Sequence, residues 1–309
     1  MAYSEGESTQ RVMIDRTEAT RLALTWLKGK GHETDAIDLC LLEEQTLETE
    51  FGWVFFYTSK LFHETGDFKY AVAGNAPMIV DRTLGSLHLT GTARSIEYYI
   101  EEFRRQRALI GLSTATFIGQ PCDDDSILTK LPCNYLEFLR SVNGCVVFGG
   151  GLHIRGVANE PDWHSMRRVW IEDDRLSALY PQVHADDVPF AQDCLGDQFL
   201  LRSNSVYRLS GETGEIENLE LGWQDFFSAA TANPIEFLSL QPLQRFKLDG
   251  NSLEPGQLLN VYPPFCTKES ANGVSMKAVP ALEQIRFLAD FSDQIATVAN
   301  GTKIRMSVK

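Results

Sequence analysis

The side chains best suited to chemistry gather near the middle of this 309-residue chain. Residues 160–174 read EPDWHSMRRVWIEDD, and a second acidic pair follows at residues 186–187. Adjacent carboxylates can bind a cation or divide acid and base roles between them. Adjacent acids in a loop are more often simply solvated, so a surface role is favoured over a catalytic one. The residues singled out are Asp162, Trp163, Trp170, Glu172, Asp173, Asp174, Asp186 and Asp187.

Other patterns that would indicate an enzyme do not occur in the sequence. The six histidines are isolated, and none forms an HxxxH or HxH arrangement. There is no GxSxG nucleophile elbow and no phosphate-binding loop; Gly74–Pro77 (GNAP) and Gly149–Gly151 both precede strand-like residues rather than a helix. We therefore expect no catalytic residue and no enzyme activity.

The six cysteines are widely spaced and form no CxxC pair, which predicts reduced and mostly buried thiols. Zinc would need two close pairs of Cys or His, so no metal or cofactor is expected. Cys194 lies between Asp193 and Asp197. Neighbouring carboxylates raise a thiol pKa, which is unfavourable for a nucleophile.

The net charge of −14 is concentrated in residues 121–225, which hold 18 acidic and eight basic side chains. Nucleic-acid binding depends on lysine and arginine, so direct nucleic-acid binding is not expected. A basic protein is the more sensible partner. The N-terminal sequence does not resemble a signal peptide and no apolar run is long enough to cross a bilayer, which predicts a cytoplasmic protein without membrane contact.

The spacing of apolar residues divides the chain into two α+β modules, at residues 11–109 and 126–309, joined by a linker at 110–125. In the first module we expect helices over residues 17–28 and 96–108, the former ended by Gly29 and Gly31. Between them we expect an antiparallel sheet with both helices on one side. Its strands are predicted at residues 50–59, 68–73, 78–81 and 86–90.

Several segments of the first module resemble the Immunity protein 35 family. They are Trp53 with Phe55 and Tyr57, GNAP at Gly74–Pro77, IVDR at Ile79–Arg82, TLGSLHLTGT at Thr83–Thr92 and SIEYYIEEF at Ser95–Phe103. The resemblance implies a small α+β domain encoded beside bacterial polymorphic toxins, with no catalytic residues.

In the second module, a helix begins at Leu131-Pro132 and ends at Asn143-Gly144. A hairpin is predicted from residues 206–209 and 216–219, followed by helices at 223–230 and 283–297. Several segments resemble the SUKH superfamily, whose bacterial members are mostly immunity proteins. They are LPCNYLEFLRSVNG (Leu131–Gly144), PFAQDCLGDQFLL (Pro189–Leu201), VYRLSGETGEIENL (Val206–Leu219), WQDFFSAA (Trp223–Ala230), LEPGQLLNVYPPF (Leu253–Phe265) and LADFSDQI (Leu288–Ile295).

These observations favour an immunity protein that binds a cognate toxin and blocks its active site. Acidic side chains of residues 160–174 would speed association, and Trp163 and Trp170 would slow dissociation. If the toxin acts on nucleic acid, its cleft is basic and the acids would mimic phosphates. The alternative interpretation of residues 160–174 is that both tryptophans belong to the hydrophobic core and that the acidic side chains are simply exposed to solvent. Alternatives for the chain are a SUKH-type scaffold or regulatory module without a toxin partner, and a hydrolase built on Asp173 or Asp186.

Overall fold

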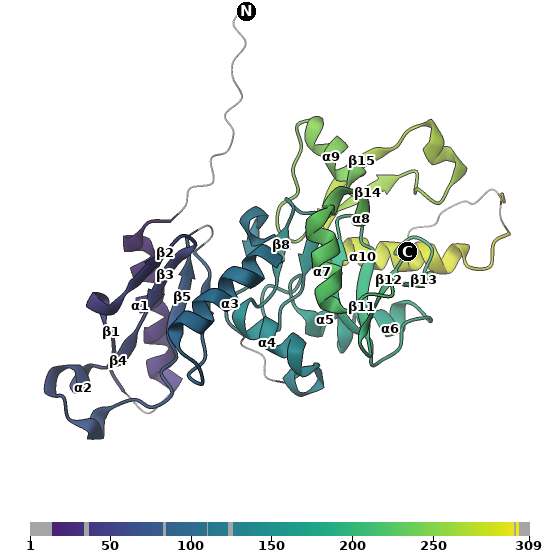
Figure 1. The fold of residues 1–309 in the computed structure, drawn as a ribbon. Helices are drawn as coiled ribbons and strands as arrows, with labels where there is room; N and C mark the ends of the chain where they lie inside the picture. The colour runs from purple at the N-terminus through teal and green to yellow at the C-terminus, as the bar shows by residue number, and fades with distance from the viewer. Residues whose placement is uncertain are drawn as a thin grey trace, which may run out of the picture. The chain divides into compact units, whose positions relative to one another are not determined.

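The computed structural model describes residues 14–33, 37–82, 85–109, 111–122, 126–299 and 301–302. Its internal contacts divide the chain into two compact units, Met1–Arg104 (the N-terminal unit) and Arg105–Lys309 (the C-terminal unit). Both units combine helices with antiparallel sheets, so the predicted α+β class is confirmed (Figure 1). The division falls inside a helix, and part of the segment predicted as a linker forms a strand of the C-terminal unit.

The N-terminal unit is built on a four-stranded antiparallel sheet of order β2-β3-β5-β6 and a small β1-β4 pair. In chain order its elements are α1 (Arg16–Glu33), β1 (Leu39–Leu41), η1 (Glu43–Gln45), β2 (Leu47–Thr49), β3 (Gly52–Phe55), β4 (Tyr57–Ser59), α2 (Lys60–Thr65), η2 (Phe68–Tyr70), β5 (Met78–Asp81), β6 (Leu87–Leu89) and the start of α3 (Ile96–Leu109).

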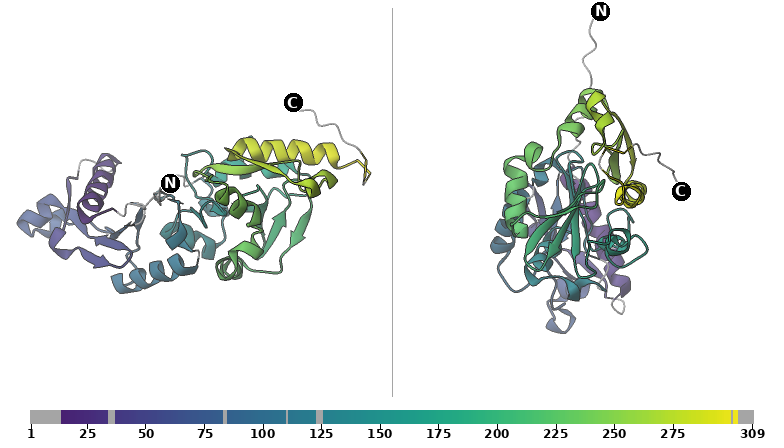
Figure 2. Two further views of the ribbon diagram at one scale, coloured as in Figure 1. Left: turned by 90° about the horizontal axis from the view of Figure 1, so that it is seen from above. Right: turned by 90° about the vertical axis from the view of Figure 1, so that its right-hand side faces the viewer.

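Both faces of this sheet are covered, because every residue of β3 and β5 is buried. On one face Trp53 and Val80 pack with Ala23 of α1. On the other, Phe103 of α3 lies 5.0 Å from Phe51 and 4.9 Å from His88, measured between ring centroids. Figure 2 shows α1 and α3 on opposite sides of the sheet. The prediction that both helices cover one side was therefore wrong.

Two local predictions for this unit were also wrong. The first helix continues through Gly29 to Glu33, because a glycine weakens a helix by about 1 kcal/mol without ending it. The segment predicted as a strand over residues 68–73 begins with the 3₁₀ helix η2 instead. There the Asp67 carboxylate accepts the Lys69 backbone N–H at 3.1 Å and caps the turn.

The C-terminal unit contains a seven-stranded antiparallel sheet of order β13-β12-β11-β10-β9-β8-β7, so neighbouring strands follow one another along the chain. Its elements are η3 (Leu112–Thr114), β7 (Phe117–Ile118), η4 (Leu128–Lys130), α4 (Cys133–Ser141), β8 (Cys145–Val147), β9 (Leu152–Ile154), α5 (Met166–Trp170), α6 (Leu176–Leu179), β10 (Val188–Asp193), β11 (Gln198–Arg202), β12 (Ser205–Leu209), β13 (Ile216–Asn218), α7 (Trp223–Ala232), α8 (Pro234–Phe237), α9 (Gln241–Leu248), β14 (Gln257–Tyr262), η5 (Lys268–Asn272), β15 (Ser275–Pro280) and α10 (Ala281–Ile295).

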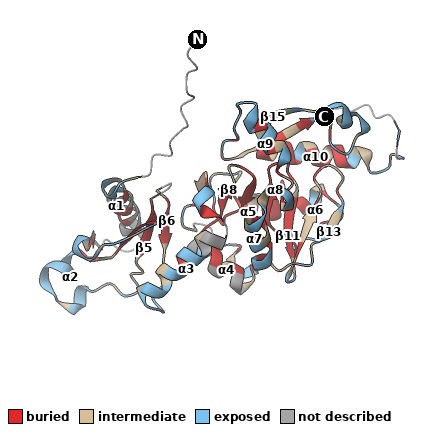
Figure 3. Cartoon of the chain, turned by 45° about the horizontal axis from the view of Figure 1, so that its top comes forward, coloured by how far each residue is buried: buried red, intermediate tan, exposed pale blue. Residues whose placement is uncertain are grey.

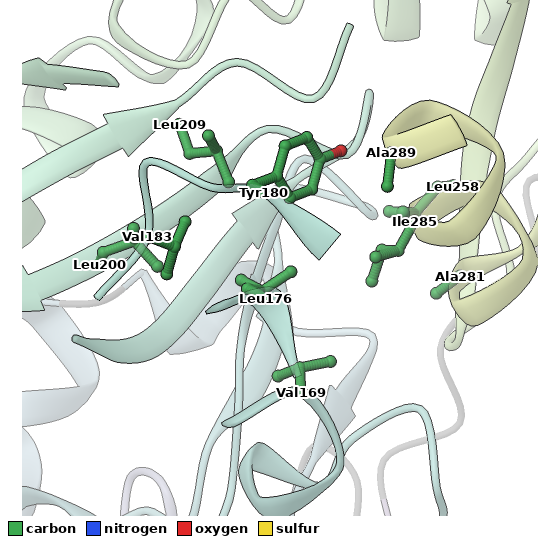
Figure 4. Packing of buried hydrophobic residues seen from close by; sticks show 10 residues of the cluster. All are labelled: Val169, Leu176, Tyr180, Val183, Leu200, Leu209, Leu258, Ala281, Ile285 and Ala289. Atoms are coloured by element: carbon green, nitrogen blue, oxygen red, sulfur yellow. The ribbon is translucent and has the colours of Figure 1, made fainter. Parts of the chain in front are cut away.

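The two faces of the seven-stranded sheet carry different cores, because side chains alternate along each strand. Phe199 contacts Phe226 of α7 on one face, where Phe190 meets both Phe226 and Tyr135 of α4 edge to face. Leu200, the next residue along, joins the opposite core (Figure 4). That core is formed by Val169, Leu176, Tyr180, Val183, Leu200, Leu209, Leu258, Ala281, Ile285 and Ala289.

The second core brings α10 and the β14-β15 hairpin onto the sheet. The hairpin pairs from Gln257↔Pro280 to Tyr262↔Ser275. It is tied to the larger sheet by the Leu259 N–H, which donates to the Cys194 carbonyl oxygen at 2.7 Å. The predicted hairpin of β12 and β13 is confirmed by the pairing Leu209↔Ile216.

A buried arginine occupies the centre of the sheet. Arg155, 1% exposed, follows β9 and lies at a register shift of β10 between Pro189 and Ala191. Its guanidinium donates to the carbonyl oxygens of Pro189 at 3.0 Å and Ala191 at 3.3 Å, and to the side-chain oxygens of Gln192 at 2.7 Å and Gln198 at 2.6 Å. Burial lowers the pKa of Arg155 to about 9, so the group remains charged at neutral pH. All four acceptors are uncharged, and together they replace the water that the cation loses.

We expect Arg155→Lys to lower the free energy of unfolding of the C-terminal unit by about 2–4 kcal/mol, because an ammonium cannot reach both carbonyls and both amides. Chemical denaturation measures the change. Arg245→Lys is the matched control, since the Arg245 side chain is 71% exposed. Equal stability of the two variants would contradict the role assigned to Arg155.

Candidate functional site

The two tryptophans predicted as partner anchors belong to the core of the C-terminal unit. Trp170 is 8% exposed, and its indole N–H donates to the Ala185 carbonyl oxygen at 3.1 Å. The partly buried Trp163 ring lies 4.8 Å from Phe117 and 5.2 Å from His153, between ring centroids. These contacts occupy the rings, so the structure does not support the use of either tryptophan as an exposed anchor.

Three of the predicted acids are held in ion pairs inside the unit. Asp174, 3% exposed, accepts from Arg168 at 2.7 Å and from Arg286 at 2.6 Å. Although burial opposes it, these two guanidinium groups lower the pKa of Asp174. Glu172 pairs with Arg168 and with Arg167, the latter at 2.9 Å.

Asp187 is the third paired acid. It is 2% exposed, and both its oxygens accept from Arg202 at 2.8 Å. One of these oxygens also accepts the His184 backbone N–H at 2.8 Å. Asp187 therefore fixes the loop that enters β10 and is not presented to a partner.

Asp162, Asp173 and Asp186 are exposed, as the sequence pattern predicted. Of the eight predicted binding residues, these three acids remain on the surface with their charge available for long-range attraction. The predicted binding residues that remain on the surface are therefore these three acids, two of them in residues 160–174.

Adjacent acids in this segment should respond very differently to neutralisation. We expect Asp174→Asn to destabilise the C-terminal unit by about 1–3 kcal/mol, because Arg168 and Arg286 lose their shared carboxylate. Asp173→Asn should change stability by less than about 0.5 kcal/mol. Denaturant titration of both variants tests this, and equal losses would contradict the structural role of Asp174.

The structure joins two histidines that are eleven positions apart in the sequence. His153 and His164 are 5% and 1% exposed, and their Nε2 and Nδ1 atoms are 3.0 Å apart. His164 Nε2 must donate to the Asn143 carbonyl oxygen at 2.8 Å, since a carbonyl only accepts. His164 Nδ1 therefore accepts from His153 Nε2, and His153 Nδ1 accepts from the Gln192 amide at 3.2 Å.

Both rings are neutral in this arrangement. Burial lowers the pKa of His164 to about 4 and lowers that of His153 well below its ordinary value, and His164 and Arg155 add to the effect on His153. A buried pair with every nitrogen in a hydrogen bond has no path to a substrate. The histidines consequently act as parts of the core and not as acid–base catalysts.

The neutral pair makes the stability of the C-terminal unit depend on pH. The unfolded chain takes up protons on these histidines below pH ~6.5, whereas the folded unit does not until a much lower pH. Stability is therefore full above pH ~6.5 and should fall by at least about 1 kcal/mol per pH unit as the pH is lowered towards 5. Denaturant unfolding across this range measures the slope.

The control compares two histidine variants by the slope of unfolding free energy against pH, and not by their absolute stability. His164→Gln removes one buried titrating group and should flatten the dependence. His184→Gln, at an exposed histidine, should leave it unchanged. A slope that is the same in all three proteins would contradict the assignment.

A cavity of about 190 Å³ opens where the seven-stranded sheet meets β14 and α10. Its walls come from the β10–β11 turn, β12, the β12–β13 turn, β14 with the loop after it, and α10. It is lined by Leu195, Asp197, Arg208, Ser210, Glu212, Leu259, Val261, Pro264, Phe265, Gln284, Phe287 and Leu288.

The charged groups of the cavity are organised around Arg208. The guanidinium lies 2.6 Å from Asp197 and 3.6 Å from the buried Asp193. Although burial opposes it, these carboxylates raise the pKa of Arg208. Burial and the charge of Asp197 raise the pKa of Asp193 to about 8. Glu212 accepts the backbone N–H groups of Phe265 at 3.0 Å and Cys266 at 2.8 Å.

Only one part of this cavity was predicted from the sequence, the turn that contains Glu212. The reading of Gly211–Gly214 as a turn placed Glu212 in a loop, but no local pattern connects it to a loop some 50 residues later. The thiol pKa of Cys194 is raised, as the sequence predicted, although burial contributes more to the rise than the charge of Asp193. No motif identified the cavity, because its walls come from segments far apart in the chain.

The N-terminal unit exposes an apolar surface formed by α2 and η2, here called the α2–η2 surface (Figure 3). Phe68 is 84% exposed, Leu61 51% and Tyr70 37%. The segment is nonetheless well ordered by hydrogen bonds: Ser59 caps α2 through the Phe62 N–H at 3.1 Å, and its hydroxyl donates to the Tyr70 carbonyl oxygen. Exposed aromatic side chains on a fixed backbone suit contact with another protein.

Within the part of the chain that the structure describes, no three His, Cys, Asp or Glu side chains are grouped so as to hold a metal ion. The helices among the described residues are also too short or too polar to span a membrane.

The fold and these surfaces define a two-unit α+β protein with surfaces suited to protein contact. Residues 17–105 match the family model of Immunity protein 35. The uncharacterized protein YrhB of Escherichia coli (strain K12) is 39% identical over 84 residues, which is 26% of this chain and 87% of YrhB. Through its N-terminal unit, the chain belongs to the Immunity protein 35 family.

A solved structure, Atu4351 from Agrobacterium tumefaciens, matches 58% of this chain and 86% of its own with 14% identity and a TM-score of 0.35. A TM-score at this level does not establish a shared fold.

Proposed function

We propose that the protein is a bacterial immunity protein that binds a cognate protein toxin and blocks its active site without catalysis. The observation that carries the proposal is the match of residues 17–105 to the Immunity protein 35 family. The family implies a toxin partner. The net charge of −14 favours a basic toxin, including one that acts on nucleic acid.

For the N-terminal unit, the α2–η2 surface is the proposed contact. Its side chains are exposed without being loose, so a partner can bury Phe68 and Leu61 at little cost in backbone entropy. The carboxylates of Asp38 and Asp67 flank it, together with Lys60 and Lys69. Such a mixed rim around an apolar centre is typical of protein interfaces.

For the C-terminal unit, the proposal rests on the motif resemblance of Leu131–Gly144 and Pro189–Leu201 to the SUKH superfamily and on the exposed acids. We propose that it too serves immunity, in a polymorphic or type VI secretion toxin system and in the cytoplasm. A scaffold or regulatory module without a toxin is the competing hypothesis. Pull-down from cells that lack any toxin distinguishes the two.

Co-expression tests the function directly. The toxin encoded beside this gene is produced in a susceptible host with and without the full chain. We expect restored growth and co-purification of the two proteins. Failure to restore growth, together with failure to co-purify, would reject the immunity function.

The α2–η2 surface is tested with variants of equal exposure in the two units. We expect Phe68→Ser to weaken toxin binding by at least about tenfold, because a central exposed aromatic side chain supplies much of the affinity of an interface. Leu248→Ser is the matched control, since Leu248 is 83% exposed on α9. Calorimetry measures affinity, and thermal unfolding verifies that both variants are folded. Unchanged binding by Phe68→Ser would remove this surface from the interface.

A further inference from the structure

The cavity of the C-terminal unit has a long apolar wall and one polar end. Leu195, Val261, Phe287 and Leu288 supply the wall from three separate parts of the chain. Drug-sized ligands occupy pockets of roughly 300–1,000 Å³. The 190 Å³ here suits a smaller group, such as one long side chain.

The polar end has an unbalanced negative charge. The Arg208 charge is already matched by Asp197, at 2.6 Å. The Glu212 carboxylate accepts from the backbone N–H groups of Phe265 and Cys266 and from the Cys266 thiol, and none of these donors is a cation. These three bonds fix the carboxylate and occupy three of its roughly four acceptor positions, so it can accept from one more donor.

The mouth of the cavity carries an exposed aromatic side chain. Phe265 lines the cavity and is 42% exposed. An aromatic rim beside a fixed carboxylate matches the aliphatic stem and charged head of lysine or arginine.

We propose that this cavity receives a single basic side chain, lysine or arginine, from the protein toxin. Its stem lies against Leu195, Val261 and Leu288, and its head pairs with Glu212 beside the Ser210 hydroxyl. The inference rests on the proposed function and adds to it a second contact and the chemistry of the partner there.

The cavity is first tested without any toxin. N-acetyl-arginine amide and N-acetyl-lysine amide are titrated into the full chain, and methyl resonances of Leu195, Val261 and Leu288 are followed by NMR. We expect saturable shifts, with N-acetyl-norleucine amide binding about tenfold more weakly because it has the stem without the charge. No saturable shift, or equal binding of the norleucine compound, would overturn the proposal. Preferred binding of N-acetyl-glutamate amide would also overturn it.

Three variants then distinguish binding inside the cavity from binding elsewhere on the surface. Ser210→Leu fills the cavity and should abolish the shifts. Glu212→Gln removes the charge and should weaken arginine binding about tenfold. Glu215→Gln, at an exposed acid in the same turn, should change nothing. If Glu212→Gln disturbs the loop that contains Phe265 and Cys266, Ser210→Leu still tests the cavity. Undiminished chemical-shift changes in Ser210→Leu would overturn the proposal.

The same variants in the growth assay separate the two hypotheses. If the wild-type chain protects the host cells and Ser210→Leu binds the toxin at least about tenfold more weakly, the immunity function and the cavity contact are both supported. If Ser210→Leu binds as well as the wild type, the cavity contact is wrong and the immunity function stands. If the wild-type chain neither protects nor binds the toxin, the immunity function fails, and with it the toxin as the source of the side chain.

Discussion

A buried arginine without a carboxylate among its hydrogen-bond partners is the constraint on which the C-terminal unit depends. The Arg155 cation can stay in the core only if oxygen atoms replace its lost water. Two of those oxygens are the carbonyls exposed where β10 shifts register, and two come from Gln192 and Gln198. Gln192 in turn orients His153, which orients His164, which bonds to the backbone at Asn143. One chain of polar groups thus links the middle of the sheet to the end of α4.

The second polar centre of this unit has a different physical character. The Arg208 guanidinium pairs with the Asp197 carboxylate at 2.6 Å, so its charge is matched by an acid rather than by neutral amides. Asp193 and Asp197 fix the β10–β11 turn and the start of the β12–β13 turn. Leu258 of β14 and Leu288 of α10 pack against these turns. The cavity exists because the walls come from a sheet, a hairpin and a helix, whose surfaces do not close completely at their junction.

The two units present different kinds of surface to a partner. In the N-terminal unit both faces of the sheet are covered, and the exposed side chains of Phe68, Leu61 and Tyr70 lie on the short helices inserted between β4 and β5. In the C-terminal unit most of the predicted binding residues make contacts within the unit. A surface feature that can still receive a partner is the cavity lined by Glu212. The proposed immunity role would use an apolar contact from one unit and a charged contact from the other.

The sequence by itself determined the α+β class, most helices and strands, the raised pKa of the Cys194 thiol and the relationship of residues 17–105 to an immunity family. These depend on local periodicity, turn residues and motif order, which are visible along the chain. Tertiary structure alone decided that Trp170, Asp174 and Asp187 are internal, because their partners Ala185, Arg286 and Arg202 lie up to 112 positions away. It also decided the His153–His164 pair and the cavity, since burial and charge pairing arise from residues that only folding brings together.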